Sequence, residues 1–426
     1  MAACGGAMAE LPQPAGPEAF APFDPRQAAL GRLLFYDPIL SGNRNISCGT
    51  CHHHDQFSAD GVSLGIGEGG QGVGPERTAP DGPNRIAKRV PRHAPALWNL
   101  GAREFRIFFH DGRVSASPDY GNGMNTPAEE WLPEGLDSLL AAQAIFPLVA
   151  QFEMAGNPGE NEVAGAVNDR IDYAWPILAK RVRGLPEYAS LFQQAFDLET
   201  PQAVTIAHIA NALAAFMNAE WRSTDSPFDR HLRGEGALSP AQARGMELFY
   251  GKAGCRTCHS GVFQTDHQFH ALGLPPFGPG RTRVFDPIAR DTGRMAESND
   301  AADAYRFRTP SLRNVALTPP YGHNGAYPTL AGIIRHHLDP EQGLETWRPE
   351  QANLPQAPWL HEIDFVIRQD RLEMARQRRA IDIDPVLLTE AEIGDLVSFM
   401  EALSGAESRY GRLGRPEKVP SGLKVD

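Results

Sequence analysis

The chain has 426 residues, a formal net charge of −12 at pH 7 and 42% hydrophobic residues, values that are ordinary for a globular protein of two or three domains. The acidic balance argues against a nucleic-acid partner. There is no run of 18 apolar residues, so no membrane-spanning helix is predicted.

Residues 1–27 are interpreted as an N-terminal tail, because proline and alanine dominate it from residue 9 onwards. The first four residues, Met-Ala-Ala-Cys, resemble the end of a bacterial lipoprotein signal, in which small residues precede a lipid-modified cysteine. The charged and apolar regions of a signal peptide are missing. Two interpretations of Cys4 stay open, a periplasmic lipid anchor or a thiol on a disordered tail.

The remainder is interpreted as two halves, 28–220 and 221–426, because one pattern occurs in each. A glycine precedes a Leu-Phe-Tyr sequence, and a Cys-x-x-Cys-His sequence follows, which indicates a weak internal duplication. The glycines are Gly31 and Gly245, and the Leu-Phe-Tyr copies are residues 34–36 and 248–250.

Helical signals are clear in several places. Apolar residues follow helical spacing over residues 206–217, and capping signals predict further helices after Ser239 and after Thr389. Segments 61–84 and 273–294 are rich in glycine and proline and are expected to be loops. No alternation typical of strands stands out, so the sequence predicts a mainly α fold with long ordered loops.

The two Cys-x-x-Cys-His segments predict two covalently bound haems c. Two thiols can add to the vinyl groups of a haem, and the adjacent histidine then reaches the iron from the same turn. Zinc is the alternative, but zinc sites usually pair their cysteines much closer together than these two segments lie. The residues are Cys48, Cys51 and His52 in the first segment and Cys255, Cys258 and His259 in the second.

The two segments at this spacing, with five others, resemble the bacterial dihaem cytochrome c peroxidase and MauG family. The resemblance spans about residues 28–405 and implies two cytochrome c-like domains, 28–220 and 221–426, with the haems near the domain interface. The five further segments are residues 109–113, 226–230, 269–273, 307–315 and 320–325.

The resemblance implies that the second iron, held by His259, has a sixth ligand. Family peroxidases place a methionine shortly after the segment 320–325, whereas MauG-like enzymes have a tyrosine, and the matching residue here is Tyr327. A phenolate stabilises Fe(III) and Fe(IV) better than a thioether does, so such a haem would store oxidising equivalents. A packed tyrosine with another ligand, either Met295 or one of several histidines, is the alternative.

The first iron, held by His52, is expected to be open. Many family peroxidases carry a capping histidine shortly after the first motif, but residues 61–80 contain no histidine, methionine or lysine. His93 is the main competitor, and its match to the family's Arg-Asn-x-Pro segment implies a structural role. The first haem is therefore predicted to be five-coordinate or water-bound.

Cleavage of peroxide also needs a distal acid–base group. The family's Gln and Glu are replaced here by Phe and Pro, so His110 is the nearest titratable replacement, with Glu153 and the pair Glu129 and Glu130 as other candidates. A hydrogen-bonded structural histidine is the alternative for His110.

Two further roles come from position in the family alone. Trp98 matches a tryptophan between the two haems, which implies an electron relay, although a core tryptophan is the alternative. The family also binds calcium between the haems, and oxygen ligands suit that ion. The matching ligands here are the carbonyls of Arg308 and Pro310, with Asn84 as a third.

Together these features predict a periplasmic MauG-type oxidase. Hydrogen peroxide is expected to react at the first haem and to leave a high-valent, bis-Fe(IV)-type state shared through Trp98. That state would oxidise a tryptophan of a partner protein, and the similarity to the MauG- and MbnH-type branch suggests a copper-binding partner. The alternatives are a dihaem peroxidase fed with electrons by a small cytochrome or copper protein, and a pure electron-transfer cytochrome.

Overall fold

The regular structure of the computed structural model is mainly helical, in agreement with the prediction. The three helices expected from spacing and capping signals are present as α7 (Ile206–Glu220), α9 (Pro240–Tyr250) and α15 (Glu390–Ala402), and each begins with a capping box. No helix among the described residues is long and apolar enough to cross a membrane. The structure describes residues 11–82, 85–281, 289–409 and 411–426.

Two packed helix pairs account for the repeated glycine. Helix α1 (Pro25–Tyr36) packs against α7, and α9 packs against α15. A Cβ at Gly31 would lie 1.8 Å from the carbonyl oxygen of Ala212, and one at Gly245 would lie 2.0 Å from that of Asp395. Since any larger residue would force each pair apart, the glycines are required by this close approach.

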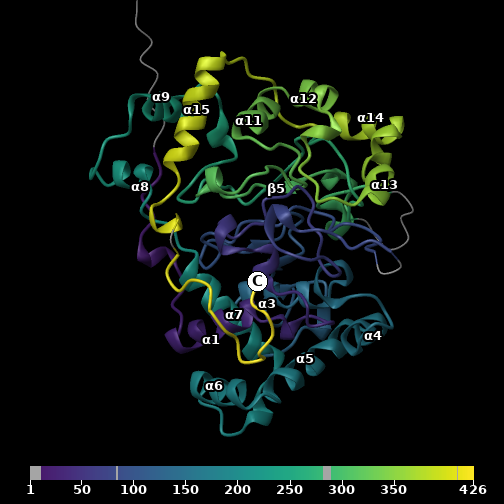
Figure 1. Ribbon diagram of the computed structural model, residues 1–426. Helices are drawn as coiled ribbons and strands as arrows, with labels where there is room; N and C mark the ends of the chain where they lie inside the picture. The colour runs from purple at the N-terminus through teal and green to yellow at the C-terminus, as the bar shows by residue number, and fades with distance from the viewer. Residues whose placement is uncertain (1–10, 83–84, 282–288, 410) are drawn as a thin grey trace, which may run out of the picture.

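The first half surrounds the α1–α7 pair with short helices and a small sheet (Figure 1). The sheet is antiparallel with the order β1-β2-β3. Its strands are β1 (Ile107–Phe108), β2 (Val114–Ala116) and β3 (Met124–Asn125), and the helices are α2 (Cys48–Cys51), α3 (Leu139–Ala144), α4 (Glu162–Asp169), α5 (Ala174–Arg183) and α6 (Pro186–Phe196).

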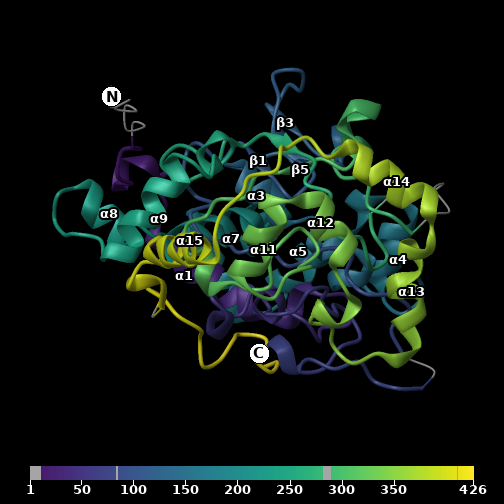
Figure 2. The same ribbon diagram turned by 90° about the horizontal axis from the view of Figure 1, so that it is seen from above.

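The second half lies beside the first and is built around the α9–α15 pair (Figures 1 and 2). Strand β4 (Phe269–His270) pairs antiparallel with β5 (Phe307–Arg308). The other helices are α8 (Pro227–Leu232), α10 (Met295–Ser298), α11 (Leu330–Leu338), α12 (Pro340–Thr346), α13 (His361–Phe365) and α14 (Arg371–Ala380).

The C-terminal segment departs from the expected division at residue 220, because it returns to the first half (Figure 1). Val419 is buried in the core that α1 and α7 form. The buried carboxylate of Glu220 accepts hydrogen bonds from the backbone N–H groups of Arg412 at 3.0 Å and Leu413 at 2.5 Å. A buried carboxylate needs such donors, so this interaction fixes the segment in place.

A buried ionic network joins the two halves near the sheet. The guanidinium of Arg92 lies between the carboxylates of Asp111, at 2.6 Å, and Asp291, at 2.7 Å. Arg113 also contacts Asp111, at 3.1 Å. Because removing one member would leave an unpaired buried charge, the network locks the loop after β1 against the second half.

Candidate haem sites

The first Cys-x-x-Cys-His segment forms a single helical turn. Cys48–Cys51 is α2, and Ser47 and Thr50 form its capping box. His52 follows directly, and its Nδ1 donates a hydrogen bond to the carbonyl of Ser58 at 2.9 Å. This bond favours one tautomer and leaves Nε2 as the ring atom that would bind a metal ion, which is the arrangement usual for a metal-binding histidine.

The second segment repeats this arrangement. Residues Cys255–Thr257 form a 3₁₀ turn, and Nδ1 of His259 donates to the carbonyl of Gln264 at 3.1 Å. All four cysteines of the two segments are free thiols. Burial raises the pKa of Cys48, Cys51 and Cys255 to about 12, so these thiols are protonated at neutral pH.

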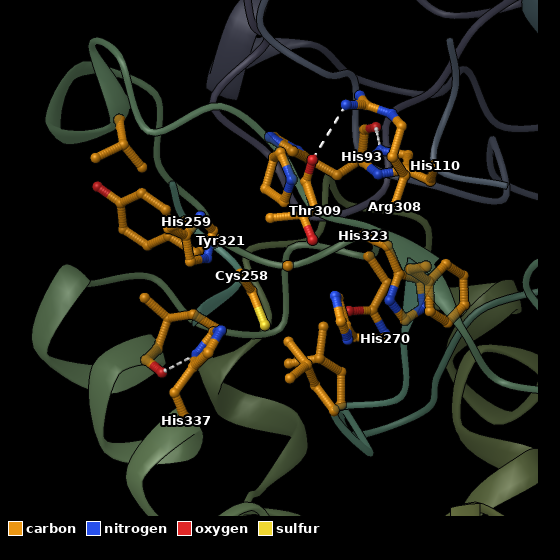
Figure 3. Close-up of a pocket in the computed structure, with 18 of the residues that line it drawn as sticks. His93, His110, Cys258, His259, His270, Arg308, Thr309, Tyr321, His323 and His337 are labelled. Carbon is orange, nitrogen blue, oxygen red and sulfur yellow. Dashed lines mark hydrogen bonds between the residues drawn. The ribbon is translucent and has the colours of Figure 1, made fainter. Parts of the chain in front are cut away.

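A cavity of about 720 Å³ opens beside the second segment, and its size is in the range of cofactor sites (Figure 3). Cys255, Cys258 and His259 line one part of it. Apolar residues of α9, α11 and α15 line another part. Two thiols, an imidazole with a free Nε2 and an apolar wall fit a c-type haem. The apolar residues are Phe249, Leu330, Ile333, Ile334, Leu396 and Met400.

His337 faces His259 across this cavity (Figure 3). The two ring centroids are 6.4 Å apart, and Nδ1 of His337 donates to the carbonyl of Ile333 at 2.8 Å. Two imidazoles on opposite sides of one metal ion, each bonded at about 2.0 Å, would have centroids roughly 6.2 Å apart. Burial and the neighbouring His337 lower the pKa of His259 to about 4, so its imidazole is neutral, as a ligand must be.

Tyr327 does not take this place. It is buried outside the set of residues that line the cavity, and its hydroxyl donates to Nδ1 of His336 at 2.8 Å. His336 in turn donates through Nε2 to the carbonyl of Leu272 at 2.8 Å. This geometry argues against the expectation that Tyr327 is the sixth ligand, because its hydroxyl is already engaged by a different partner. Met295, the other candidate, lies on α10 and does not line the cavity either.

We expect Tyr327→Phe to leave the absorption spectrum of the second haem unchanged. The substitution removes the hydrogen bond to His336 and should lower the free energy of unfolding by about 1–2 kcal/mol. Spectra of the purified ferric protein and a denaturant titration measure the two effects. A shifted spectrum of the second haem would restore Tyr327 as its ligand.

The structure offers no complete zinc site among the residues that it describes. One cluster brings Cys258, Asp266 and His270 within 4.8 Å of one another. It lacks Cys255 and a fourth ligand, and the carboxylate of Asp266 is occupied by His270 at 2.9 Å. Structural zinc sites are four-coordinate, so the second segment fits haem better than zinc.

Two protonatable carboxyl groups lie beside the first segment. Burial raises the pKa of Glu153, against the opposing effect of Arg113 and Arg281, and burial raises the pKa of Asp60 to about 7. Both carboxyl groups are close enough to the Cys51 thiol to contribute to its raised pKa. Glu153 is thus placed by the structure near the first haem segment, together with the Arg113 guanidinium.

His110, the first candidate for the distal acid–base group, lies beside His93. It lines the cavity of the second segment, and its Nε2 donates to the carbonyl of His93 at 3.2 Å (Figure 3). The turn after β1 directs it there, with Phe109 in a left-handed conformation at φ 65°. The predicted acid–base role of His110 at the first haem stays a prediction. His93 itself donates to the carbonyl of Val62 at 2.8 Å, which agrees with the structural role expected for it.

The other predicted residues are placed as follows. Trp98 lines the cavity beside the second segment and donates through Nε1 to the carbonyl of Phe57 at 3.0 Å. Glu129 and Glu130 are exposed, on the 3₁₀ turn Glu129–Trp131, which makes them poor candidates for a sequestered acid–base group. Of the calcium candidates, Arg308 and Pro310 line the same cavity, and Asn84 lies outside the described residues, as does Cys4.

Sequence reasoning missed His337, although a signal for it exists. Leu330, Ile333, Ile334 and His337 follow the spacing of one apolar helical face, and all four line the cavity. A histidine at the end of such a stripe is a candidate ligand. His54, two residues after the ligand position of the first segment, bridges the hydroxyl of Tyr36 at 2.6 Å and the carboxylate of Glu220 at 2.9 Å.

Comparison with known proteins gives a consistent family assignment. The family model described as di-haem cytochrome c peroxidase matches residues 25–237. Methylamine utilization protein MauG from Methylorubrum extorquens is 30% identical over 318 residues, which cover 74% of this chain and 70% of that protein. Cytochrome c peroxidase Ccp from Escherichia coli is 30% identical over 327 residues, 76% of this chain and 55% of that protein.

The fold has solved counterparts as well. The crystal structure of a MauG-like protein associated with microbial copper homeostasis superposes with a TM-score of 0.59 at 24% identity and covers 96% of this chain and 97% of that chain. At this level of identity the likeness establishes the mainly helical dihaem-peroxidase fold.

Proposed function

The chain belongs to the di-haem cytochrome c peroxidase and MauG family of haem-dependent oxidoreductases, and on that premise we propose that it uses hydrogen peroxide to oxidise a tryptophan side chain of a periplasmic partner protein. The two haems that the family implies would be held by Cys48, Cys51 and His52 and by Cys255, Cys258, His259 and His337. When bound, they supply the iron that reacts with peroxide and holds the oxidising equivalents.

The observation that carries this proposal is the imidazole of His337 opposite His259. A peroxidase fed by a small cytochrome benefits from a second haem of high reduction potential, which a methionine ligand provides. An imidazole is a stronger donor to ferric iron and gives a lower potential. A second haem with two imidazole ligands is therefore better suited to share oxidising equivalents than to collect electrons from a high-potential donor.

At the first site, Glu153 is the side chain that we assign to proton transfer. A carboxyl group with a raised pKa can take the proton from one peroxide oxygen and return it to the other. The nearby Arg113 guanidinium is held by Asp111 at 3.1 Å and stacks on the Phe109 ring with its carbon 3.4 Å from the ring centroid. A fixed positive charge there would stabilise negative charge that develops on the leaving oxygen.

Trp98 connects the two sites through the backbone. Its indole lines the cavity beside the second segment, and its Nε1–H donates a hydrogen bond to the carbonyl of Phe57. The carbonyl of the next residue, Ser58, accepts the Nδ1 hydrogen bond of His52, and the Ser58 hydroxyl oxygen accepts a hydrogen bond from the backbone N–H of Leu97 at 2.9 Å. This position supports the proposal that Trp98 carries electrons between the haems.

The partner is proposed from the relatives. MauG proteins are named for methylamine utilization, and one structural relative is associated with copper homeostasis. Copper-binding periplasmic proteins are therefore the first substrates to try. A calcium ion held by the carbonyls of Arg308 and Pro310 and a lipid anchor at Cys4 remain part of the proposal.

The test is oxidation of a candidate partner by the diferric holoprotein and hydrogen peroxide. We expect peroxide-dependent oxygen addition to one tryptophan of the partner, detected by tandem mass spectrometry, and slow peroxide turnover with reduced cytochrome c. Rapid cytochrome oxidation without any modified tryptophan would favour the electron-fed peroxidase instead.

A further inference from the structure

Helix α14 has two faces of different character. Its buried face carries Glu373 and Gln377, which are 0% and 5% exposed. Its outer face carries Leu372, which is 61% exposed. The other exposed residues of the helix are Arg371, Ala375, Arg376, Arg378 and Arg379.

The buried face of α14 borders the cavity of the second haem segment. Gln377 lines that cavity directly. Glu373 accepts a hydrogen bond from the hydroxyl of Tyr305 at 2.6 Å and pairs with Arg290 at 3.0 Å, and both of these residues also line the cavity. Figures 1 and 2 show α14 at the edge of the molecule. One helix therefore separates this part of the cavity from solvent.

The outer face is basic in a chain whose net charge is −12. Arg376 pairs with Glu373 at 3.3 Å and Arg378 with Glu345 at 2.6 Å. Arg371 and Arg379 form no ion pair with any residue that the structure describes. Their charges are available to a partner.

The same region exposes apolar side chains. Besides Leu372, the adjoining segment exposes Ile363 on α13 and Val366 just after it, each by 46%. Val366 is followed directly by Ile367, which lines the cavity. Protein–protein interfaces favour an apolar centre and are enriched in arginine, whereas lysine is depleted in them.

We propose that the outer face of α14 is the docking surface for the protein substrate and that it takes an acidic surface of that protein. The proposal rests on the proposed function, because it names where that function's substrate binds. The acidic remainder of the chain repels an acidic partner, so α14 and its arginines are where such a partner is attracted. Docking there brings the partner to within one helix of the second haem cavity.

The test uses two synthetic peptides, each with one tryptophan, flanked by glutamates in one and by lysines in the other. Binding to the holoprotein is measured by fluorescence anisotropy without peroxide, and tryptophan oxidation is measured by mass spectrometry with peroxide. We expect the glutamate peptide to bind more tightly than the lysine peptide and to weaken with salt. The double substitution Arg371→Glu/Arg379→Glu should weaken its binding about tenfold or more.

A matched control carries the same charge change elsewhere, Arg103→Glu/Arg230→Glu. Both side chains are exposed, and Arg230 lies on α8 at the opposite edge of the molecule (Figure 2). Leu372→Asp tests the apolar centre, and an unchanged haem spectrum shows that each variant is folded. Equal weakening in the control, or no charge-dependent binding to the wild type, would overturn the docking surface.

The outcomes separate the two proposals. Peptide binding that depends on α14 without tryptophan oxidation would support the docking surface and refute the proposed function. Tryptophan oxidation that is unchanged in both Arg371→Glu/Arg379→Glu and Arg103→Glu/Arg230→Glu would support the proposed function and refute the docking surface. Vesicles containing phosphatidylglycerol form a third arm, and if they bind more tightly than the glutamate peptide and lose binding in Arg371→Glu/Arg379→Glu, the surface serves a membrane and the protein partner is refuted.

Discussion

His337→Met is expected to raise the reduction potential of the second haem, by on the order of 0.2 V out of the roughly 0.8 V that axial ligands span. The reason is the replacement of an imidazole, which favours ferric iron, by a thioether, which favours ferrous iron. His337→Ala should open the site and change its spectrum to that of a five-coordinate or water-bound haem. Spectroelectrochemical titration of the purified holoprotein measures both effects.

The neighbouring histidine supplies the control for this prediction. Both ring nitrogens of His336 are engaged, by Tyr327 at 2.8 Å and by the carbonyl of Leu272 at 2.8 Å. His336→Gln should therefore lower stability and leave the potential of the second haem where it is. If His336→Gln shifted the potential and His337→Met did not, the assignment of His337 as the ligand would be refuted.

Glu153→Gln is expected to slow the reaction of the ferric protein with hydrogen peroxide by about 10²–10⁴-fold, the range usual for removal of a proton-transfer group. The glutamine keeps the size of the side chain and cannot accept the peroxide proton. Stopped-flow absorption, with peroxide in excess, gives the second-order rate constant. In the wild type this rate should increase with pH as Glu153 loses its proton. Because burial raises the pKa of Glu153, the increase should occur at a higher pH than it would for an ordinary glutamate.

His110→Ala is the matched comparison, since His110 was the first acid–base candidate in the sequence. His110 lines the cavity beside the second segment and is hydrogen-bonded to the carbonyl of His93. We expect His110→Ala to react with peroxide at a rate within about threefold of the wild type. The variant should keep the wild-type pH dependence of that rate. A large loss in His110→Ala with none in Glu153→Gln would exchange the two roles.

Much of the fold could be predicted from local signals. The helices at 206–217 and after Ser239 and Thr389 follow apolar spacing and capping boxes, which act within a few residues. The duplication is visible in the sequence at Gly31 and Gly245, but the sequence does not show why a glycine is needed at these positions. Only the packed structure shows that each glycine lies against a carbonyl of a helix far along the chain.

The haem segments could be predicted because their chemistry is confined to five consecutive residues. The proposed sixth ligand, His337, could not, since it lies on a different helix and depends on which face that helix turns to the cavity. Tyr327 precedes α11, whereas His337 lies at its end on the cavity face. The return of residues 411–426 to the first half was equally hidden, because it depends on the buried Glu220.

We propose that one iron is open and that the other would be closed by His259 and His337. Electron paramagnetic resonance of the diferric wild-type protein tests it most directly. We predict equal amounts of one high-spin ferric signal, from the first haem, and one low-spin signal of the bis-imidazole type, from the second. Two low-spin signals, or a low-spin signal of the imidazole–phenolate type, would contradict this assignment.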